Sequence, residues 1–527
     1  MNDPVSVARS HSLADLLRRT AARYPDKTAL IDGSVSITYA EFDRAVSAVA
    51  GVLLDRGLAQ GDRVALLARN SWQFAVISQA TARAGLVLVP VNFMLKADEV
   101  AFILEHSGAV AVIADEGALQ VTMAEALATA GVEPVLRGVI CGAESGEKAP
   151  PEGWENTSDW VEAEARELDV LIGDDDPVRI MYTSGTESRP KGALLSSRSL
   201  ISEYVTSIVD GGMTADDIDL HTLPLYHCAQ LDCFLGPDIY LGATSIILPA
   251  PDPAMVLRTI EMYKVTKYFA PPTVWIGLLR HPEFDTFDLS SLVKGYYGAS
   301  PMPVEVLREI QQRLPNLRLW NFYGQTEMAP VATVLPPEDQ VAHAGSAGRP
   351  ALNVETRVVD DFDNPLPPGE VGEVVHRSPH ATLGYYNDPE KTAAAFANGW
   401  FHSGDLGVMG EDGRLTIVDR KKDMIKSGGE NVASREVEEA IYEHPDVAEV
   451  AVFALPDPRW VEAVTAAVVL KQGATTSGDD IRAYLAERIA AYKVPKAIHI
   501  RHSLPKNPSG KILKRTLRAD FAENAPQ

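Results

Sequence analysis

The sequence predicts an α/β protein with a large N-terminal domain and a smaller C-terminal unit. Three observations lead to this prediction. The chain has 527 residues, which is too long for one ordinary domain. Helical and strand patterns alternate along the N-terminal part, as they do in proteins with parallel sheets. The pattern changes near residues 405–435, where two tight turns, a basic cluster and a glycine pair precede a run that alternates like antiparallel strands.

The N-terminal elements follow from these patterns in order. Residues 11–32 predict an amphipathic helix and then a short strand. Residues 36–71 predict a strand, a long helix that ends near Gly57, and an apolar strand. Residues 71–92 repeat the order of helix and strand. Residues 116–165 contain the Gly, Pro and acidic residues of a surface excursion, so we expect little regular structure there.

The domain boundary is predicted at the basic cluster that begins with Arg420. Residues 1–419 then form the N-terminal domain, residues 420–422 a hinge, and residues 423–527 the C-terminal domain. Within the last of these, the segment "AEVAVFALPDPRWVEAVTAAVVL" predicts a pair of antiparallel strands.

Charge and composition exclude several classes of function. The net charge of -24 argues against nucleic acid or an anionic membrane as the main partner, although a local site can still be positive. The three cysteines, Cys141, Cys228 and Cys233, have no C-x-x-C spacing, which favours a reducing cytoplasm over a disulfide framework or a zinc site. The N-terminal residues lack the pattern of a secretory signal, and no apolar run is long enough to span a bilayer. We therefore expect a cytoplasmic protein without a membrane span.

The stretch "MYTSGTESRPKGALLSS", residues 181–197, predicts a loop that holds phosphate. A buried strand at "VRIMY" leads into the turn "TSGTESRPKG", and residues 193–209 predict a helix. A glycine- and hydroxyl-rich turn between strand and helix can present backbone N–H groups to a phosphate, and Lys191 adds positive charge. The turn differs from a Walker A loop, because the second glycine before the lysine and the final Ser/Thr are both missing.

Three more segments place a charged residue on or beside a glycine turn. They are "YGQTE" with Glu327, "HSGDLG" with Asp405, and "PSGKILKR" with Lys511. Each segment alone is also typical of an ordinary turn, a helix cap or a solvated basic face. All four segments in this order and spacing favour a common site.

Together these residues resemble the adenylate-forming superfamily, which contains acyl-CoA synthetases, adenylation domains and luciferases. The resemblance covers nearly the whole chain, from "TYAEFDRAV" to "GKILKR". It rests on six motifs in order: "YTSGTESRPKG", "LPLYHCAQ", "YYGASPM", "YGQTE", "WFHSGDLG" with "VDRKKDMIKSGGENV", and "PKNPSGKILKR". Two of them, "VDRKKDMIKSGGENV" and "LPLYHCAQLD", are most similar to acyl-CoA synthetases of the fatty-acid type.

The resemblance implies a fold and a reaction in two halves. The implied fold is α/β, with a large N-terminal domain of sheets sandwiched by helices and a small mobile C-terminal α+β domain. In the first half-reaction, a carboxylate attacks the α-phosphate of ATP and forms acyl-AMP and pyrophosphate in the presence of Mg²⁺. The C-terminal domain then turns, and the thiol of coenzyme A displaces AMP to form a thioester.

The resemblance also implies roles for individual residues. The ATP (AMP) and coenzyme A site would contain Thr183, Ser184, Gly185, Thr186, Glu187, Ser188, Lys191, Gly298, Ala299, Ser300, Asn321, Tyr323, Gly324, Thr326, Asp405, Arg420, Gly428 and Gly429. Within this set, Asp405 would accept hydrogen bonds from the ribose hydroxyls with help from Arg420, and Tyr323 would lie against the adenine.

The remaining implied roles concern catalysis, the acyl pocket and the hinge. Thr186 and Glu327 would organise Mg²⁺, and Lys511 would stabilise charge in the adenylation transition state. Lys426, with Gly428 and Gly429, would face the site after the domain turns. His227, Gly298 and Ala299 would line the acyl pocket, whose size would also depend on packing around Trp275, and Lys422 would lie at the hinge. A closed site that builds up negative charge favours cations placed for the transition state.

The phosphate loop departs from the family pattern T-S-G-T-T-G-x-P-K-G at two positions. Glu187 replaces the second Thr and Ser188 replaces the following Gly. A carboxylate ~4 Å from a phosphate charge costs on the order of 4 kcal/mol at an effective dielectric near 20, before any compensation by Arg189 or Mg²⁺. Ser188 would also resist a positive φ. In the C-terminal domain, Val461 stands where relatives commonly have Gly, and the substitution either narrows the thiol channel or is without effect on it.

Four functions remain open at this point. The first is a complete acyl-CoA ligase that uses ATP, Mg²⁺ and coenzyme A. The second is a relative that only converts a supplied acyl-AMP to the thioester, as the altered loop suggests. The third loads a carrier protein instead of coenzyme A, and the fourth binds acyl-adenylate without catalysis. The carboxylic acid is not readable from the sequence, and a homodimer is an expectation from relatives alone.

Overall fold

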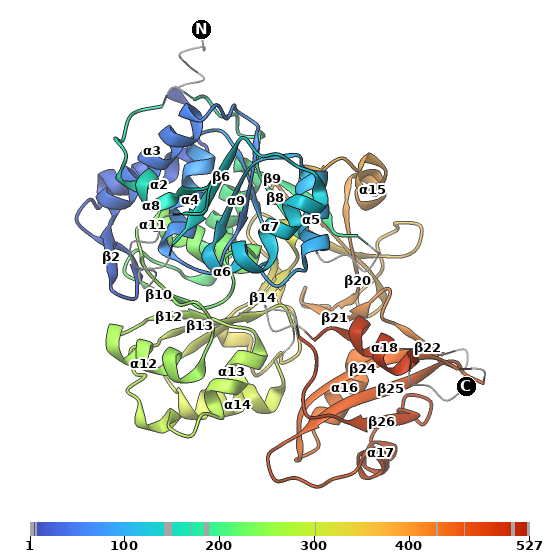
Figure 1. Ribbon diagram of the computed structural model, residues 1–527. Coiled ribbons are helices and arrows are strands. Elements are labelled where there is room, and N and C mark those ends of the chain that lie inside the picture. Colours follow the sequence, from blue (N-terminus) through green and yellow to red (C-terminus); the bar gives the residue numbers. More distant parts are fainter. Residues whose placement is uncertain are drawn as a thin grey trace.

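The computed structural model describes residues 5, 8–141, 150–168, 170–183, 189–300, 302–427, 430–457, 459–506 and 512–523. Figure 1 shows a large part made by the N-terminal and central segments, and a smaller part at the lower right made by the C-terminal segment. A small antiparallel sheet that contains β20 and β21 lies beside the C-terminal part. The predicted α/β fold with a large and a small domain is confirmed.

Two large sheets form the N-terminal domain. Within the described residues, the first has nine strands in the order β16 (Arg349–Pro350), β15 (Val331–Leu335), β14 (Arg318–Gly324), β13 (Lys294–Gly298), β12 (Lys267–Phe269), β10 (Ile218–His221), β11 (Thr244–Ile247), β1 (Thr28–Asp32) and β2 (Val35–Thr38). The second has eight described strands in the order β19 (Gly384–Tyr385), β9 (Lys191–Ser196), β8 (Pro177–Thr183), β4 (Val87–Pro90), β3 (Arg63–Leu67), β5 (Ala109–Asp115), β6 (Leu136–Ile140) and β7 (Glu155–Asn156). Most central strands of both sheets pair in parallel.

Helices cover both faces of each sheet. The N-terminal helices are α2 (Leu13–Arg23), α3 (Tyr39–Asp55), α4 (Trp72–Arg83), α5 (Ala97–Ser107), α6 (Glu116–Ala118), α7 (Ala124–Ala130), α8 (Thr157–Glu162), α9 (Ser197–Gly211), α10 (Cys228–Gln230), α11 (Gly236–Leu241), α12 (Pro253–Tyr263), α13 (Pro272–Leu279), α14 (Val304–Arg313) and α15 (Pro389–Ala395). One apolar core contains residues of α3 and α4 together with residues of β1, β11 and β3, so these helices lie between the two sheets. Separate cores join α12–α14 to the nine-stranded sheet and α5 and α7 to the eight-stranded sheet.

The sequence of β3 shows why these layers form. Val64 and Leu66 belong to the core between the sheets, whereas Ala65 and Leu67 belong to the core on the opposite face. Successive side chains of a strand point to opposite faces, so a strand covered on both faces must be apolar throughout. The run "RVALLA" meets that requirement.

A small antiparallel sheet joins the two domains. It consists of β17 (Glu355–Val359), β18 (Val371–Arg377), β20 (Phe401–Met409) and β21 (Leu415–Arg420). The C-terminal domain follows with β22 (Ile425–Ser427), β23 (Glu430–Val432), α16 (Ser434–Tyr442), β24 (Val447–Asp457), β25 (Val461–Leu470), α17 (Gly478–Ala486), β26 (Ala497–Ile500) and α18 (Lys514–Glu523). The predicted antiparallel pair is present as β24 and β25. The predicted hinge lies at the end of β21 and in the turn before β22.

Two predictions of local structure are wrong. Residues 193–196 belong to strand β9, and the helix α9 begins only at Ser197. β9 is held from both sides, by β8 and by β19, and these ladder hydrogen bonds outweigh the helical preference of "ALLSS". Residues 116–165 also contain more structure than expected, because β6 adds to the eight-stranded sheet and α7 packs on α5.

Candidate functional site

The described ends of the phosphate loop lie on two neighbouring antiparallel strands. Thr183 at the end of β8 is paired with Lys191 at the start of β9. Residues 184–188, which include Ser184, Gly185, Thr186, Glu187 and Ser188, lie outside the described residues. Because a strand follows the loop, the positive end of a helix dipole does not begin directly after it. A phosphate in this loop would depend on backbone N–H groups and on side-chain charge.

Two basic side chains beside the loop contact aromatic rings. The guanidinium of Arg189 lies 5.2 Å from the centroid of the Phe102 ring. The ammonium of Lys191 lies 5.5 Å from the centroid of the Tyr385 ring. The hydroxyl of Tyr385 in turn donates a hydrogen bond to Glu327 Oε1 at 2.9 Å. Tyr385 therefore brings the loop lysine and the motif glutamate to the same place.

Glu327 and Thr326 lie on η4 (Thr326–Met328), a short 3-10 turn after β14. The carbonyl oxygen of Glu327 accepts a hydrogen bond from the backbone N–H of Thr382 at 2.8 Å. Thr326 Oγ1 lies 3.4 Å from the thiol of Cys228. Backbone and side-chain contacts thus fix the direction of the Glu327 carboxylate.

The strand ends of β13 and β14 leave no room for side chains at two glycines. A Cβ at Gly298 would lie 2.4 Å from the backbone oxygen of Phe322, and a Cβ at Gly324 would lie 1.8 Å from the backbone oxygen of Pro330. Ala299 has a φ of 63°, and Ser300 is exposed. The buried Asn321 donates a hydrogen bond to the backbone oxygen of Ser346 at 3.2 Å. These residues form a tight, backbone-lined surface next to η4.

Tyr323 and Arg420 hold the carboxylate of Asp405 from two sides. The hydroxyl of Tyr323 donates a hydrogen bond to Asp405 Oδ2 at 2.6 Å, and Nε of Arg420 lies 3.4 Å from Asp405 Oδ1. Asp405 and Arg420 are register partners on β20 and β21. Burial, and then the charge of Asp405, raise the pKa of Tyr323 well above its ordinary value, so its hydroxyl remains a donor. The structure brings these three predicted residues together.

We expect Asp405→Asn to raise the KM for ATP by about 10- to 100-fold, because hydrogen bonds to an ionised carboxylate are worth about 1.5–3 kcal/mol each. Steady-state pyrophosphate release at varied ATP concentration measures this change. The control is Asp412→Asn, in the turn between the same two strands, where the carboxylate pairs with Arg414 at 2.6 Å. Equal KM values for the two variants would contradict a nucleotide role for Asp405.

The hinge and thiol-side residues are partly described. Lys422 is exposed, and partial desolvation, followed by the positive charge of Arg420, lowers its pKa. Lys426 is exposed on β22, and its backbone N–H donates to Glu462 Oε2 at 2.6 Å. Gly428, Gly429 and Lys511 lie outside the described residues.

Val461 has a strained backbone next to Lys426. It is the register partner of Ser427 on β22, its φ is 68°, and its side chain is 71% exposed. Among the described non-glycine residues with a positive φ, it alone is β-branched. A left-handed conformation costs an L-residue about 1–2 kcal/mol.

We expect Val461→Gly to raise the free energy of unfolding by about 1 kcal/mol, because glycine removes the strain and the exposed side chain contributes little burial. Chemical denaturation measures this change. Val461→Ala keeps the steric conflict of a Cβ, so its free energy of unfolding should rise by less than half as much as that of Val461→Gly. A destabilised glycine variant would show that the valine side chain makes a contact that outweighs the strain.

The acyl-pocket residues separate into two groups. His227 is half-buried at the start of α10, and its Nδ1 accepts the backbone N–H of Ala229 at 3.1 Å. The neutral imidazole therefore carries its proton on Nε2. Trp275 is 1% exposed and donates to the backbone oxygen of Tyr296, and it belongs to the core under α12–α14. Its part in the pocket stays a prediction.

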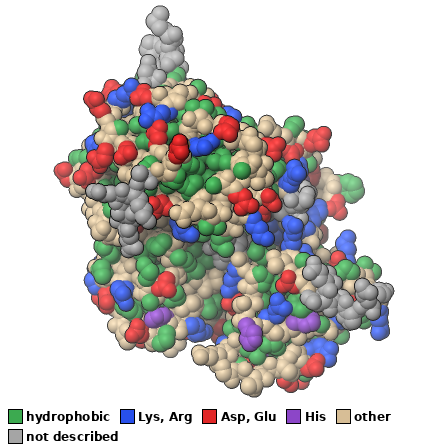
Figure 2. All heavy atoms as spheres, in the orientation of Figure 1, with side chains coloured by type: hydrophobic (Ala, Val, Ile, Leu, Met, Phe, Trp, Pro, Cys, Tyr) green, Lys and Arg blue, Asp and Glu red, His purple; other side chains and the backbone are tan. Residues whose placement is uncertain are grey.

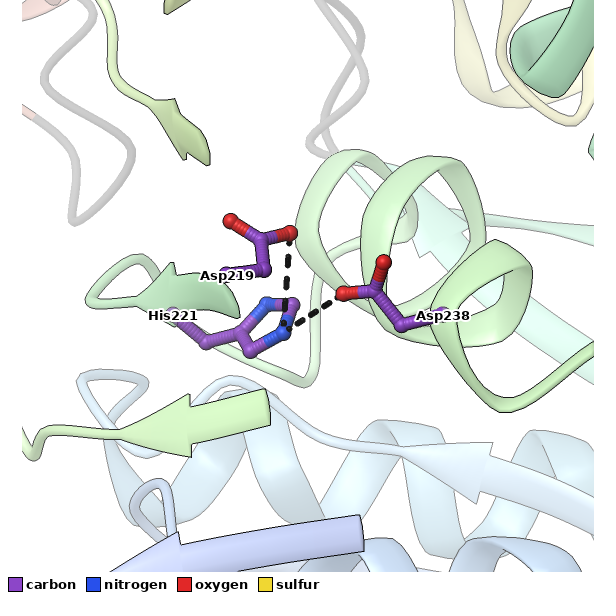
Figure 3. Close-up of side chains that lie close together, drawn as sticks. All are labelled: Asp219, His221 and Asp238. Atoms are coloured by element: carbon purple, nitrogen blue, oxygen red, sulfur yellow. Dashed lines mark hydrogen bonds and ion pairs between the residues drawn. The ribbon is translucent and has the colours of Figure 1, made fainter. Parts of the chain in front are cut away.

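A buried ionic cluster (Figure 3) is linked through Gln230 to the loop before His227. Asp219, His221 and Asp238 point toward one another, and their ligand atoms lie within 4.8 Å. The ammonium of Lys267 lies 3.2 Å from Asp219 and bonds Asp238 at an even shorter distance. Because this lysine already supplies the positive charge that a metal ion would bring, we interpret the cluster as an internal salt bridge.

Sequence reasoning missed Tyr385, Thr382 and the ionic cluster. The run "LGYYND" around Tyr385 combines a glycine with two aromatic residues in a polar setting, and that was the available signal. Asp219 and His221 lie two residues apart on β10, but their partners Asp238 and Lys267 follow 17 to 48 residues later in the sequence. Nothing local in the sequence indicates that they meet.

The surface carries charge of both signs in different places. On the face shown in Figure 2, acidic side chains are spread over the upper part, and several basic side chains gather where that part meets the C-terminal lobe. No described helix combines the length and the apolar character that crossing a bilayer would require.

Comparison with known proteins identifies the family. Residues 17–386 match the family described as "AMP-binding enzyme", and residues 436–511 match "AMP-binding enzyme C-terminal domain". The chain belongs to the AMP-binding enzyme family. The predicted resemblance to adenylate-forming enzymes of the acyl-CoA synthetase type is confirmed.

Relatives in this family cover the chain almost completely. A feruloyl-CoA synthase from Amycolatopsis sp is 36% identical over 97% of this chain and 100% of its own length. The long-chain-fatty-acid–CoA ligase FadD13 from Mycobacterium tuberculosis is 35% identical over 97% of this chain and 99% of its own. The crystal structure of the anthranilate CoA ligase AuaEII with anthranoyl-AMP matches with a TM-score of 0.90 and 26% identity over 99% of this chain and 100% of its own.

Proposed function

We propose that this protein is an acyl-CoA ligase that activates a carboxylic acid with ATP as acyl-AMP and transfers the acyl group to coenzyme A. One observation carries the proposal. Tyr385 contacts both Lys191 and Glu327. Four residues before Glu327, Tyr323 donates a hydrogen bond to Asp405, which also pairs with Arg420. These groups match the parts of a nucleotide: positive charge for phosphates and a held carboxylate for ribose hydroxyls.

The nucleotide half of the site follows from these contacts. Asp405 accepts hydrogen bonds from the two ribose hydroxyls, and Tyr323 and Arg420 keep its carboxylate in place before ATP arrives. Lys191 lies at the C-terminal end of the phosphate loop, where its positive charge offsets the negative charge of the triphosphate. Residues held before the substrate binds need no rearrangement during the reaction.

Mg²⁺ fits the donor set at Glu327. The carboxylate uses Oε1 for Tyr385, and a carboxylate has two oxygens that can accept. Mg²⁺ prefers few carboxylates plus phosphate oxygens, so one glutamate beside a triphosphate suits it, and Thr186 would complete the pair. When bound, the ion neutralises charge on the phosphates.

The chemical steps assign one lysine to each half-reaction. In adenylation, a carboxylate oxygen bonds to the α-phosphorus, the bond from that phosphorus to the bridging oxygen breaks, and pyrophosphate leaves. Lys511 stabilises the charge that builds up on the carboxylate and the α-phosphate. In thioester formation, the thiol sulfur bonds to the acyl carbon, the bond from that carbon to the phosphate oxygen breaks, AMP leaves with that oxygen, and the thiol proton passes to solvent water. Lys426, Gly428 and Gly429 face the site in this step after rotation about Lys422.

Measuring the two half-reactions separately tests the proposal. One assay follows acid-dependent pyrophosphate release from ATP across straight-chain and aryl acids, the kinds that relatives such as the fatty-acid ligase and the feruloyl-CoA synthase act on. The other supplies synthetic acyl-AMP and coenzyme A and follows thioester. We expect both to proceed. Thioester from acyl-AMP without any pyrophosphate release would instead establish the second candidate, a relative that does not adenylate.

The presence of Glu187 and Ser188 in the phosphate loop favours this second candidate. Replacing both by the residues of the family pattern gives a direct prediction. We expect the double variant Glu187→Thr with Ser188→Gly to raise kcat/KM for ATP about tenfold, because it removes a negative charge beside the phosphates and frees the loop backbone. Pyrophosphate release at limiting ATP measures the gain, and the rate from acyl-AMP should stay unchanged. Glu187→Gln alone separates charge from backbone freedom. An unchanged double variant would mean that Glu187 points away from the phosphates.

We also propose a cytoplasmic enzyme that acts on a soluble small-molecule acid as a homodimer. The odd number of cysteines without a C-x-x-C pair and the acidic surface support the first part. The family resemblance alone supports the dimer, and light scattering would test it.

A further inference from the structure

The loop that carries His227 is buried along most of its length. It spans residues 222–227 between β10 and α10, and all of them except His227 are buried. Backbone polar groups in such a place need partners, because an unpaired buried N–H or C=O is costly. The loop has one internal turn bond, from the N–H of His227 to the backbone oxygen of Pro224 at 3.1 Å, and the His227 carbonyl accepts the N–H groups of Gln230 in α10 and of Leu231 just after it. Side chains from outside the loop hold the backbone of Leu223 and Leu225. We call residues 222–227 the gate loop.

Asn70 holds the gate loop from one side. This side chain lies between β3 and α4 and is 8% exposed. Its Nδ2 donates to the backbone oxygens of Leu223 and Leu248 at 2.8 and 3.1 Å, and its Oδ1 accepts the N–H of Leu225 at 2.8 Å. One amide therefore satisfies two backbone groups of the loop and ties it to the segment after β11.

Gln230 holds the loop from the other side, and its orientation is determined by its neighbours. The backbone N–H of Leu223 can only donate, so the Gln230 atom at 3.2 Å from it must be the oxygen. Nε2 of Gln230 then lies 2.7 Å from His221 Nδ1, which must accept. The proton of the neutral His221 imidazole is consequently on Nε2, which lies 3.1 Å from Asp238 Oδ2.

The same chain of bonds ends in the ionic cluster of Figure 3. Asp238 is held in turn by Lys267, and all four side chains from Gln230 to Lys267 are fully buried. No member can rotate without breaking a bond to the next. The cluster therefore holds Gln230, and through it the gate loop, in a fixed position.

We propose that Asn70 and Gln230 are positioning residues that set the place of the His227 imidazole at the acyl pocket, and that this determines which acids the enzyme accepts. The inference rests on the proposed function, in which His227 lines that pocket. The argument is geometric. His227 Nδ1 accepts the N–H of Ala229 in α10, so the position of the ring depends on where the chain enters that helix, and the loop that leads there is tied at Leu223 and Leu225. A pocket wall displaced by a fraction of an ångström changes how well an acid is aligned.

The test compares Gln230→Met and Asn70→Ala with the wild type, using octanoate and ferulate as probes. Methionine keeps the volume of glutamine and removes both hydrogen bonds. We expect the KM for each acid to rise about 5- to 10-fold, the ratio of kcat/KM between the two acids to change by at least about fivefold, and the KM for ATP to change less than about twofold.

A matched control separates positioning from loss of stability. The Tyr39 hydroxyl is buried, donates its proton to the backbone oxygen of Ala243 at 2.6 Å and lies 3.1 Å from that of Asp238, so it supports α11 without touching the gate loop. Tyr39→Phe should lower the melting temperature to a similar extent and leave both KM values and the selectivity ratio unchanged. If Asn70→Ala does not fold, Asn70→Ser is the milder variant, because its hydroxyl can still accept.

The outcomes distinguish this inference from the proposed function. If the wild type releases no pyrophosphate with either acid, the same comparison is made with octanoyl-AMP and feruloyl-AMP plus coenzyme A, where the KM for the adenylate reports the pocket. Variants that lose stability like Tyr39→Phe but keep the selectivity ratio of the wild type would overturn the positioning role. A changed ratio of kcat/KM between the two acids in both Gln230→Met and Asn70→Ala, with an unchanged KM for ATP, supports the positioning role.

Discussion

Replacing Lys511 by alanine is expected to slow acid-dependent pyrophosphate release by about 10²- to 10³-fold, the usual cost of removing one preorganised charge from a transition state. The adenylation step gathers negative charge from a carboxylate and a triphosphate in one closed site. The ammonium of Lys511 is the cation that the family resemblance assigns to that charge. Thioester formation from acyl-AMP should keep its wild-type rate, because Lys426 faces the site in that step.

The two half-reaction assays measure this difference, with Lys506→Ala as the control. Lys506 lies five residues earlier in the same segment and forms an ion pair with Glu449 at 2.7 Å, so its charge has a partner within the C-terminal domain. We expect this control to retain both half-reactions. Equal losses in both halves for Lys511→Ala would indicate a damaged domain, and no loss in either would remove Lys511 from catalysis.

Replacing Lys267 by methionine is expected to lower the free energy of unfolding by about 3–5 kcal/mol. The ammonium is fully buried between Asp219 and Asp238. Burial raises the pKa of Asp219 to about 7, while Lys267 and His221 hold Asp238 at a low pKa against the effect of burial. Without the lysine, two carboxylates would face each other in a medium that solvates neither. Thermal and chemical denaturation measure the loss.

Lys264→Met is the matched control for this prediction. Lys264 pairs with Asp288 at 2.8 Å, but both side chains are more than half exposed. An exposed pair of this kind contributes about 0–1 kcal/mol, so the control should unfold close to the wild type. If the two variants unfold alike, the buried cluster does not stabilise the fold. A rise in the melting temperature of the wild type with added Zn²⁺ would instead support a metal site.

The helices, strands and motif residues that depend on local pattern were predictable. Helical and strand patterns alternate around β3 and α3, and glycine lies in the turn at Asp405. Such local patterns indicate the same element wherever they occur in a chain. The boundary between β9 and α9 was not predictable, because β9 is a strand only through its pairing with β8 and β19. Tyr385 was missed for the same kind of reason, since its partner Glu327 is 58 residues away.

The sequence by itself determined the fold class, the family and the chemical groups of the site. Apolar periodicity decides which elements can form, and the ordered motifs decide which reaction the residue types can serve. Only the tertiary structure decided how those groups are held. Tyr323 and Arg420 fix Asp405, and Asn70 and Gln230 fix the loop of His227. Such contacts depend on the packing of two sheets and several helices, and hydrogen bonds are satisfied in space without regard to distance along the chain.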